Sequence, residues 1–242
     1  MPSASRSRPR ERRVASPRRQ PVGVPTAALD VPPEPAADCP LCARLVDLRR
    51  RSAAAEPAWF NGAVPSFGAA DARLLIVGLA PGLKGANRTG RPFTGDYAGE
   101  LLYATLLEFG FATGNYGAAP DDGLALRDCM ISNAVRCVPP ENKPTPDEIR
   151  TCRPFLVARM AALPRLAAIL ALGRVAHEQT LAALGTRASG HPFAHGARHD
   201  LRPGLALYDS FHCSRYNTNT GRLTTPMFRA VFASIRRDLG PS

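Results

Sequence analysis

The sequence predicts an α/β protein, a three-layer sandwich in which a central, mainly parallel four-stranded sheet is flanked by helices. Short apolar runs alternate about four times with longer amphipathic segments, as in βαβ units. The apolar runs are nearly continuous, which is typical of strands buried on both faces. A length of 242 residues is enough for one sizeable core.

The expected strands cover residues 72–79, 127–136, 165–172 and 204–211. The expected helices cover residues 38–53, 97–109, 173–184 and 224–239, with a further helix beginning near Pro146. Asp38 and Asp96 are favourable N-caps, and Pro suits the first turn of a helix. No apolar run approaches the roughly 18 residues needed to cross a bilayer, so we expect no membrane partner.

Residues 1–36 are rich in Arg, Pro, Ala and Ser, which predicts a disordered basic tail before a single folded domain over residues 37–242. Seven Arg and one Glu lie within residues 1–20, and the formal net charge is +11. A basic balance indicates an anionic partner, most often nucleic acid. The tail could serve as a DNA tether or only as a solubilising segment. No apolar signal segment follows Met1, and Pro weakens the resemblance to a transit peptide, so we expect a cytoplasmic protein.

Four of the six cysteines form two spaced pairs. Cys39 and Cys42 make a C-x2-C pair, and Cys137 and Cys152 follow far downstream. In a reducing compartment such thiolates are free to bind Zn²⁺ or an iron–sulfur cluster, and spacing alone does not choose between these metals. Buried cysteines without a metal are the remaining alternative.

Three polar loops follow the first, second and fourth expected strands, at the edge where parallel sheets gather their sites. They read GLAPGLKGANRTGRPFTGD over 78–96, SNAVRCVPPENKPTP over 132–146 and HCSRYNTNTGRLT over 212–224. In this order they resemble the signature segments of the family 5 uracil-DNA glycosylases. The resemblance covers about residues 36–240.

This resemblance implies a monofunctional DNA glycosylase that hydrolyses the N-glycosidic bond of uracil and leaves an abasic site. It also implies a broad pocket that accepts other deaminated bases, such as hypoxanthine. Cys39, Cys42, Cys137 and Cys152 match the ligand positions of the family's 4Fe–4S cluster, which we expect to be structural. The expected partner is DNA containing uracil or another deaminated base, bound by a monomer.

A base that is attacked within DNA must be flipped into a pocket that offers an aromatic face and hydrogen bonds to the base edge. Phe93 matches the stacking ring of the family, and the amide of Asn133 complements the edge of uracil. Gly78, Ala80 and Gly82 complete the expected substrate-binding set. Taken singly, Phe93 could be a core residue and Asn133 a loop cap.

Cleavage develops positive charge on the sugar and negative charge on the departing base. We expect His212 to donate a hydrogen bond to uracil O2. We expect Asp96 to orient the attacking water or stabilise the sugar cation, although it could act only as a helix cap. Leu79 takes the place of the acid that family 4 carries, and Asn142 is expected to position water or substrate.

The loop after His212 carries the expected DNA-binding residues Ser214, Arg215 and Asn217, whose polar groups suit contacts with phosphate. The family usually has Pro after this His, whereas this chain has Cys213, which would loosen the backbone of the loop.

Two other classes of function fit parts of the sequence. A non-catalytic nucleic-acid-binding protein with a structural four-Cys zinc site would explain the charge and the cysteines, but not the three polar loops. A nucleotide-dependent transferase could use GLAPG as a phosphate turn, but it would need an acid, Lys and Mg²⁺ beside that loop, and Lys84 alone is poor support.

Overall fold

The computed structural model describes residues 32–240, so most of the expected basic tail lies outside the described residues. A six-stranded sheet has the strand order β1-β5-β2-β6-β8-β7. Its four inner strands are mutually parallel: β5 (Cys129–Asn133), β2 (Leu74–Gly78), β6 (Ala168–Leu172) and β8 (Leu205–Ser210). These strands are the four that the apolar runs predict, which confirms the fold class.

Two short antiparallel strands extend the sheet at its edges, beyond the four that the sequence predicts. These strands are β1 (Phe67–Gly68), beside β5, and β7 (Arg198–Arg202), beside β8. The sequence of β7 is RHDLR, and this polar composition does not identify it as a strand. It is an edge strand that is partly exposed to solvent. A separate two-stranded sheet joins β3 (Ala112–Thr113) and β4 (Ala125–Leu126).

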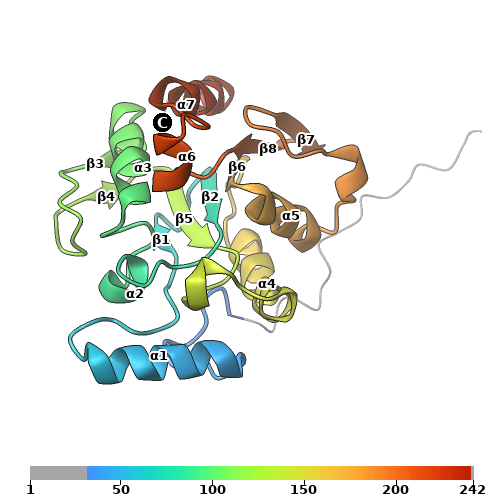
Figure 1. The fold of residues 1–242 in the computed structure, drawn as a ribbon. Coiled ribbons are helices and arrows are strands. Elements are labelled where there is room, and N and C mark those ends of the chain that lie inside the picture. Colours follow the sequence, from blue (N-terminus) through green and yellow to red (C-terminus); the bar gives the residue numbers. More distant parts are fainter. Residues whose placement is uncertain (1–31, 241–242) are drawn as a thin grey trace, which may run out of the picture.

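Helices cover both faces of the sheet and form the outer two layers. Figure 1 shows α3 (Tyr97–Glu108) and α7 (Thr225–Leu239) on one side, and α4 (Pro146–Ala161) and α5 (Arg174–Ala183) on the other. Alternate residues of β2 serve the two cores, since Ile76 packs with α3 and α7 whereas Val77 packs with α4 and α5. This burial on both sides explains the continuous apolar runs.

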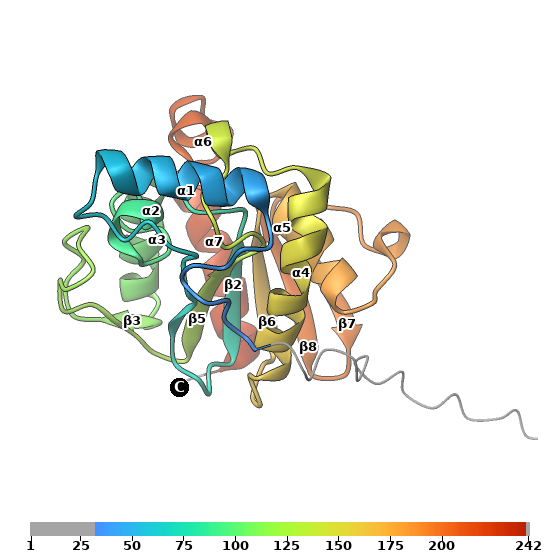
Figure 2. The ribbon, with the colours of Figure 1, turned by 90° about the horizontal axis from the view of Figure 1, so that it is seen from below.

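Shorter elements gather at one end of the sheet, where the parallel strands finish. Figure 2 shows α1 (Ala43–Ala55) lying across this end, near α2 (Ala86–Thr89) and α6 (Arg215–Asn219). Two 3-10 turns, η2 (Pro140–Asn142) and η3 (Ala188–Gly190), lie in loops. Helix α1 starts later than residues 38–53 predict, because Cys42 is its N-cap and Cys39 precedes it.

The prediction that Asp38 caps α1 is therefore wrong, whereas the starts of α3, α4 and α7 are marked by side-chain caps. The Asp96 carboxylate accepts a hydrogen bond from the Gly99 amide at 3.2 Å, and Thr145 caps α4 in a capping box with Glu148. None of the helices within residues 32–240 combines the length and apolar character that a membrane span requires.

Candidate active site

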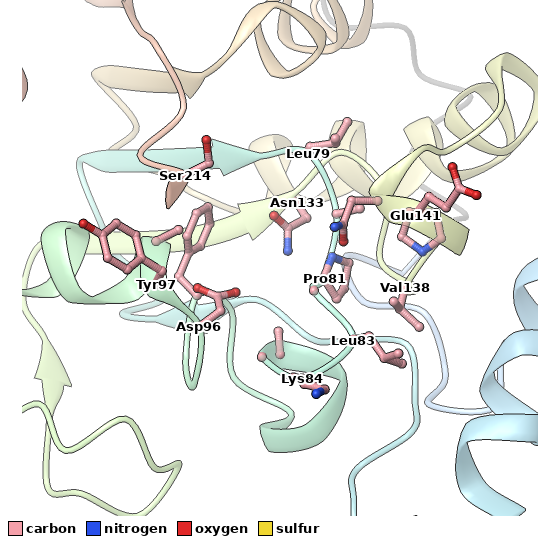
Figure 3. Close-up of a pocket in the computed structure, with 18 of the residues that line it drawn as sticks. Leu79, Pro81, Leu83, Lys84, Asp96, Tyr97, Asn133, Val138, Glu141 and Ser214 are labelled. Carbon is pink, nitrogen blue, oxygen red and sulfur yellow. The ribbon is translucent and has the colours of Figure 1, made fainter. Parts of the chain in front are cut away.

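A cavity of about 880 Å³ opens at the carboxyl end of the parallel strands. Its walls come from the loops after β2, β5 and β8, and Figure 3 shows side chains of all three loops around it. The expected site residues that line it are Ala80, Gly82, Phe93, Asp96, Asn133, Asn142, His212, Ser214 and Arg215. The fold therefore collects residues that are up to 135 positions apart, from Ala80 to Arg215.

The floor of this pocket is built on a close approach between neighbouring strands. Gly78 of β2 pairs in register with Asn133 of β5. A Cβ atom on Gly78 would lie 2.4 Å from the Asn133 side-chain oxygen and 2.7 Å from the ring of Phe93. Only glycine at position 78 allows the amide and the ring to reach the same point.

Asn133 has a buried hydrogen-bonding group without a protein partner. The residue is 3% exposed, and its side-chain oxygen Oδ1 has no hydrogen-bond partner among the described residues. Leaving a buried polar group unpaired costs roughly 1–3 kcal/mol, so such groups in native proteins call for an explanation. A ligand that donates a hydrogen bond in the pocket would satisfy this oxygen.

Backbone strain is concentrated around the pocket. Phe93, Glu141 and Asn142 line it, and each has a positive φ, of 55°, 53° and 57° respectively. Bulky residues rarely adopt this left-handed conformation, and it persists only where the surroundings enforce it. Asn142 tolerates this conformation, so the strain lies at Phe93 and Glu141, whose side chains are held in orientations that relaxed loops would not give.

Asp96 reaches into the pocket across two glycines. A Cβ atom on Gly85 would lie 2.5 Å from the carboxylate, and one on Gly82 would lie 3.3 Å from it. Burial raises the pKa of Asp96, whereas hydrogen bonds from the Gly99 and Ala98 amides lower it, and the net pKa is raised. The carboxylate is thus a helix cap and a pocket wall at the same time.

His212 enters the pocket from the loop after β8. Burial lowers the pKa of its imidazole to about 4, so the ring is neutral at physiological pH. The amide nitrogen of Asn217 donates a hydrogen bond to the His212 carbonyl at 2.8 Å. The Cys213 thiol is fully buried and donates to the Ala98 carbonyl at 3.4 Å. The loop is therefore anchored at His212 and at the residue that follows it, although it lacks Pro.

Gly78 and Asn217 are the two expected site residues that adjoin this cavity rather than line it. Gly78 supports its floor, and Asn217 lines a neighbouring cavity with Arg174 and Arg222. The side-chain amide of Asn217, a residue expected to bind DNA, donates a hydrogen bond to the backbone carbonyl of His212 within the protein.

Several lining residues carry no signal of their own in the sequence. Gly85 leaves space for the side chain of Asp96. Leu48 of α1 forms part of the wall, although it is distant in sequence from every signature loop. Tyr97 lies at the rim, with the Arg215 guanidinium 5.2 Å from its ring centroid. Tyr97 could have been found from its position directly after Asp96, whereas Leu48 could not.

The four expected metal-binding cysteines meet at a second cavity beside the first. Cys39, Cys42, Cys137 and Cys152 all line it, together with apolar residues such as Leu45 and Phe155. Burial raises the pKa of Cys137 to about 12 and that of Cys152 to about 11. Without a metal the thiols of Cys137 and Cys152 would stay protonated, so binding a metal would release their protons.

Among the described residues, no three of the cysteine sulfurs lie within 4.8 Å of one another. Within residues 32–240, the group of three metal-ligating side chains whose ligand atoms all lie within 4.8 Å is His177, His199 and Asp209, not any three of the cysteines. Four thiolates at the Zn–S distance of about 2.3 Å would have their sulfurs only about 3.8 Å apart. Four thiolates are the donor set of an iron–sulfur cluster, whereas zinc would require these sulfurs to move closer together.

The fold and the pocket define a class of protein. A sequence model described as the uracil DNA glycosylase superfamily matches residues 65–236, a range that contains all three signature loops. Type-5 uracil-DNA glycosylases are similar over most of their length. That of Thermus thermophilus is 46% identical over 208 residues, which cover 84% of this chain and 94% of the relative.

The corresponding protein of Mycobacterium tuberculosis is 40% identical over 211 residues, with 84% of this chain and 78% of the relative covered. That of Pyrobaculum aerophilum is 36% identical over 207 residues, with 84% and 90% covered. The chain belongs to the type-5 uracil-DNA glycosylases, the family 5 that its sequence resembles.

Proposed function

We propose that the protein removes uracil, and other deaminated bases such as hypoxanthine, from DNA by hydrolysing the N-glycosidic bond. The product would be an abasic site, the first intermediate of base excision repair. The observation that carries this proposal is the unpartnered, buried oxygen of Asn133 beside the ring of Phe93. The similarity to relatives that are uracil-DNA glycosylases supports it.

The chemistry of Asn133 supports a shared mode of base recognition. Its amide offers one acceptor and two donors, which complement an N–H beside a carbonyl. Uracil has this arrangement at N3 and C4, and hypoxanthine has it at N1 and C6. The pocket volume of about 880 Å³ accommodates either ring system. A single amide would therefore serve both pyrimidine and purine products of deamination.

His212 and Asp96 would supply complementary chemistry on the two sides of the scissile bond. The bond between base and C1′ breaks as its electron pair moves to the base, where the neutral His212 would stabilise the charge by donating to O2. The Asp96 carboxylate would stabilise the cationic sugar and accept a proton from the water that attacks C1′. Asn142, which also lines the pocket, would help to position that water.

We also propose that Cys39, Cys42, Cys137 and Cys152 bind a 4Fe–4S cluster. When bound, the cluster would supply structural cross-linking rather than electrons, since hydrolysis needs none. Cys42 caps α1, Cys137 precedes the pocket loop with Asn142, and Cys152 lies on α4. The cluster would hold these three segments together and so support the pocket wall.

The substrate would be DNA held at the rim of the pocket. Ser214 and Arg215 line the rim. Arg215 is exposed, with its guanidinium over the ring of Tyr97, and this position suits a contact with phosphate. We infer a folded domain over residues 37–242 that acts as a monomer in the cytoplasm, where reducing conditions keep the thiolates available. Residues 1–36 would form the basic tail of this domain.

The test is base release from a labelled duplex with one uracil opposite guanine, followed by alkali cleavage. The cluster-loaded wild type should cleave it and should spare a duplex with cytosine at that position. Asn133→Ala should lower the single-turnover rate by at least about a hundredfold, because the base loses its hydrogen-bonded edge. His191→Ala, remote from the pocket, is the control and should leave the rate unchanged. A wild type that binds DNA but cleaves neither uracil nor hypoxanthine would favour the non-catalytic alternative.

A further inference from the structure

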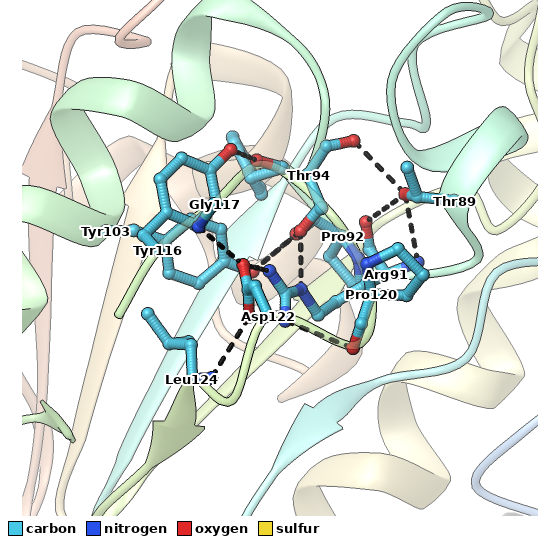
Figure 4. Close-up of polar contacts among 11 residues, drawn as sticks. Thr89, Arg91, Pro92, Thr94, Tyr103, Tyr116, Gly117, Pro120, Asp122 and Leu124 are labelled. Carbon is cyan, nitrogen blue, oxygen red and sulfur yellow. Dashed lines mark hydrogen bonds and ion pairs between the residues drawn. The ribbon is translucent and has the colours of Figure 1, made fainter. Parts of the chain in front are cut away.

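A buried ion pair lies behind the wall of the pocket that carries Phe93. The side chains of Arg91 and Asp122 are each 5% exposed. The guanidinium donates to both carboxylate oxygens, with Nη1–Oδ1 at 2.8 Å and Nη2–Oδ2 at 2.6 Å, as Figure 4 shows. Such bidentate contacts are directional as well as strong, so they fix the position of Arg91 relative to the segment that carries Asp122.

This pair is the centre of a network that holds the turn around Phe93. Arg91 Nε donates to the Thr94 hydroxyl at 2.7 Å. The Tyr103 hydroxyl donates to the Pro92 carbonyl at 2.6 Å, and the Tyr116 hydroxyl donates to the Phe93 carbonyl at 3.3 Å. The turn is therefore bound at two consecutive carbonyls.

The two tyrosines are themselves arranged around the ion pair. Their rings stack at 4.6 Å between centroids, and the Arg91 guanidinium lies 5.4 Å from the ring of Tyr103 and 5.9 Å from that of Tyr116. The Asp122 carboxylate also accepts hydrogen bonds from the backbone amides of Gly117 and Leu124. Arg91 and Asp122 thus link the pocket loop to the segment over residues 114–124, which lies outside the three signature loops.

The network encloses the strained residue of the pocket. Phe93 has a φ of 55°, an unfavourable conformation for a bulky side chain that needs enforcement by its surroundings. Gly99 leaves the space that this requires, since a Cβ atom there would lie 1.9 Å from the Phe93 carbonyl and 2.4 Å from the Tyr116 hydroxyl. The hydrogen bonds from the network hold the strained turn in place.

We propose that Arg91, Asp122 and Tyr116 are positioning residues, which set the angle of the Phe93 ring in the pocket and thereby its selectivity between pyrimidine and purine bases. The choice of bases in this inference rests on the proposed function, whereas the positioning of Phe93 rests on the contacts described above. Among the residues that the structure describes, these three do not line the pocket, so they would act on the base only through Phe93.

Selectivity should respond because the two classes of base differ in size. A pyrimidine covers one part of an aromatic wall, whereas a purine extends further along it. A small rotation of Phe93 therefore changes the two stacking contacts unequally. Misplacement by about 1 Å can cost on the order of a hundredfold in rate, so even a partial loss of alignment is measurable.

The first arm of the test is a double-mutant cycle with Tyr116→Phe, which removes one hydroxyl without leaving a buried charge. Single-turnover release of uracil and of hypoxanthine from duplex DNA is measured at saturating enzyme. Tyr116→Phe should lower uracil release by about threefold to tenfold and shift the uracil-to-hypoxanthine ratio, while DNA affinity is retained. In a Phe93→Ala background the same substitution should have no effect.

Asp122→Asn should act in the same direction and more strongly, because it leaves Arg91 without a counter-charge, and Asp122→Glu should restore part of the rate. The control is Asp71→Asn, which breaks the exposed ion pair between Asp71 and Arg165 and should change neither rate. Equal effects of Tyr116→Phe in the Phe93 and Phe93→Ala backgrounds would overturn the proposal.

The second arm needs no catalysis. In protein labelled with fluorophenylalanine, the ¹⁹F resonance of Phe93, assigned by its loss in Phe93→Leu, should shift in Asp122→Asn, which adds no labelled ring, and not in Asp71→Asn. An unmoved resonance would overturn the proposal. If the resonance shifts while the wild type releases neither base, the proposed function fails and the positioning role stands.

Discussion

The ring of Phe93 lies 5.7 Å from the imidazole of His212 between centroids, with 27° between their planes, although the two residues follow different strands. A base inserted between the rings would need about 7 Å, two contact distances of about 3.5 Å each. The rings are therefore too close to hold a base between them, so a base that stacked on Phe93 would lie beside His212. Under the proposed function, His212 would donate to a carbonyl oxygen at the edge of that base.

The first prediction concerns His212 as a neutral donor. Because burial lowers its pKa to about 4, the imidazole carries no charge between pH 5 and 8, and its titration should add no limb to the rate profile in that range. His212→Ala should lower the single-turnover rate by about a hundredfold to a thousandfold, the usual effect of removing a donor to a developing anion. The measurement is uracil release across this pH range.

The same pKa predicts a stability effect with a definite sign. His212 is only partly exposed, and with a folded pKa of about 4 and an ordinary value of 6.5 its neutral form stabilises the fold fully above pH 6.5. This contribution falls as the pH drops toward 4. The free energy of unfolding of His212→Ala should depend less on pH in this window. A rate limb near pH 6.5 that disappears in His212→Ala would contradict a neutral donor.

The second prediction separates the two roles of Asp96. Asn is as good an N-cap as Asp, so Asp96→Asn should retain helix α3 while it removes the charge. We expect the rate to fall by at least about a hundredfold, with the free energy of unfolding unchanged or raised, since burial raises the pKa of this carboxyl and disfavours its charge. Asp96→Ala should lose the rate and about 1 kcal/mol of stability.

Chemical unfolding and single-turnover assays on both variants make the comparison. If Asp96→Asn cleaves at the wild-type rate, the carboxylate serves only as a cap, and Asn142 becomes the next residue to test. A general-base role also predicts a loss of rate at acidic pH that sets in above the ordinary Asp range, because the pKa is raised.

The inner sheet and the helix starts could be predicted from sequence because their signals are local. Each inner strand is an apolar run buried on both faces, and caps such as Asp96 satisfy the first amides of their own helices. The edge strand β7 and the short helix α6 could not, because β7 alternates exposed polar residues and α6 has only five residues. Both depend on neighbours that are distant in sequence.

The candidate site likewise has features that local motifs predict and features that depend on residues distant in sequence. The three loops carry most pocket residues, so their motifs locate the wall. The positive φ of Phe93, the space that Gly85 leaves for Asp96 and the pairing of Arg91 with Asp122 depend on packing between loops. Asp122 lies in a segment without a motif, and its partner is 31 residues away, so composition and spacing give no sign of the pair.

The third prediction concerns the cysteines. Cys152→Ala should lose iron and the absorbance near 400 nm and should lower the melting temperature, because α1, α4 and the loop after Cys137 would no longer be joined. Cys129→Ala is the matched control, since Cys129 is equally buried but lies in the sheet core away from this cavity. It should keep four irons per chain.

Metal analysis and absorbance spectra decide this prediction without an activity assay. Zinc rather than iron in protein purified without oxygen would contradict the cluster. A colourless Cys152→Ala protein with wild-type melting temperature and full activity would contradict its structural role.

The fourth prediction concerns Tyr216, a large side chain that is 71% exposed next to Arg215 on the short helix α6 after His212. A ring exposed beside a pocket that receives a flipped base can fill the space that the base leaves in the duplex, as apolar wedges do in the minor groove. Tyr216→Ala should therefore lower cleavage of uracil paired with adenine by about tenfold, since unstacking costs a few kcal/mol. Cleavage in single-stranded DNA should change little, because no stacked pair has to open, whereas Tyr216→Phe should keep most of the duplex rate. Equal losses on both substrates would show that Tyr216 supports the loop rather than base flipping.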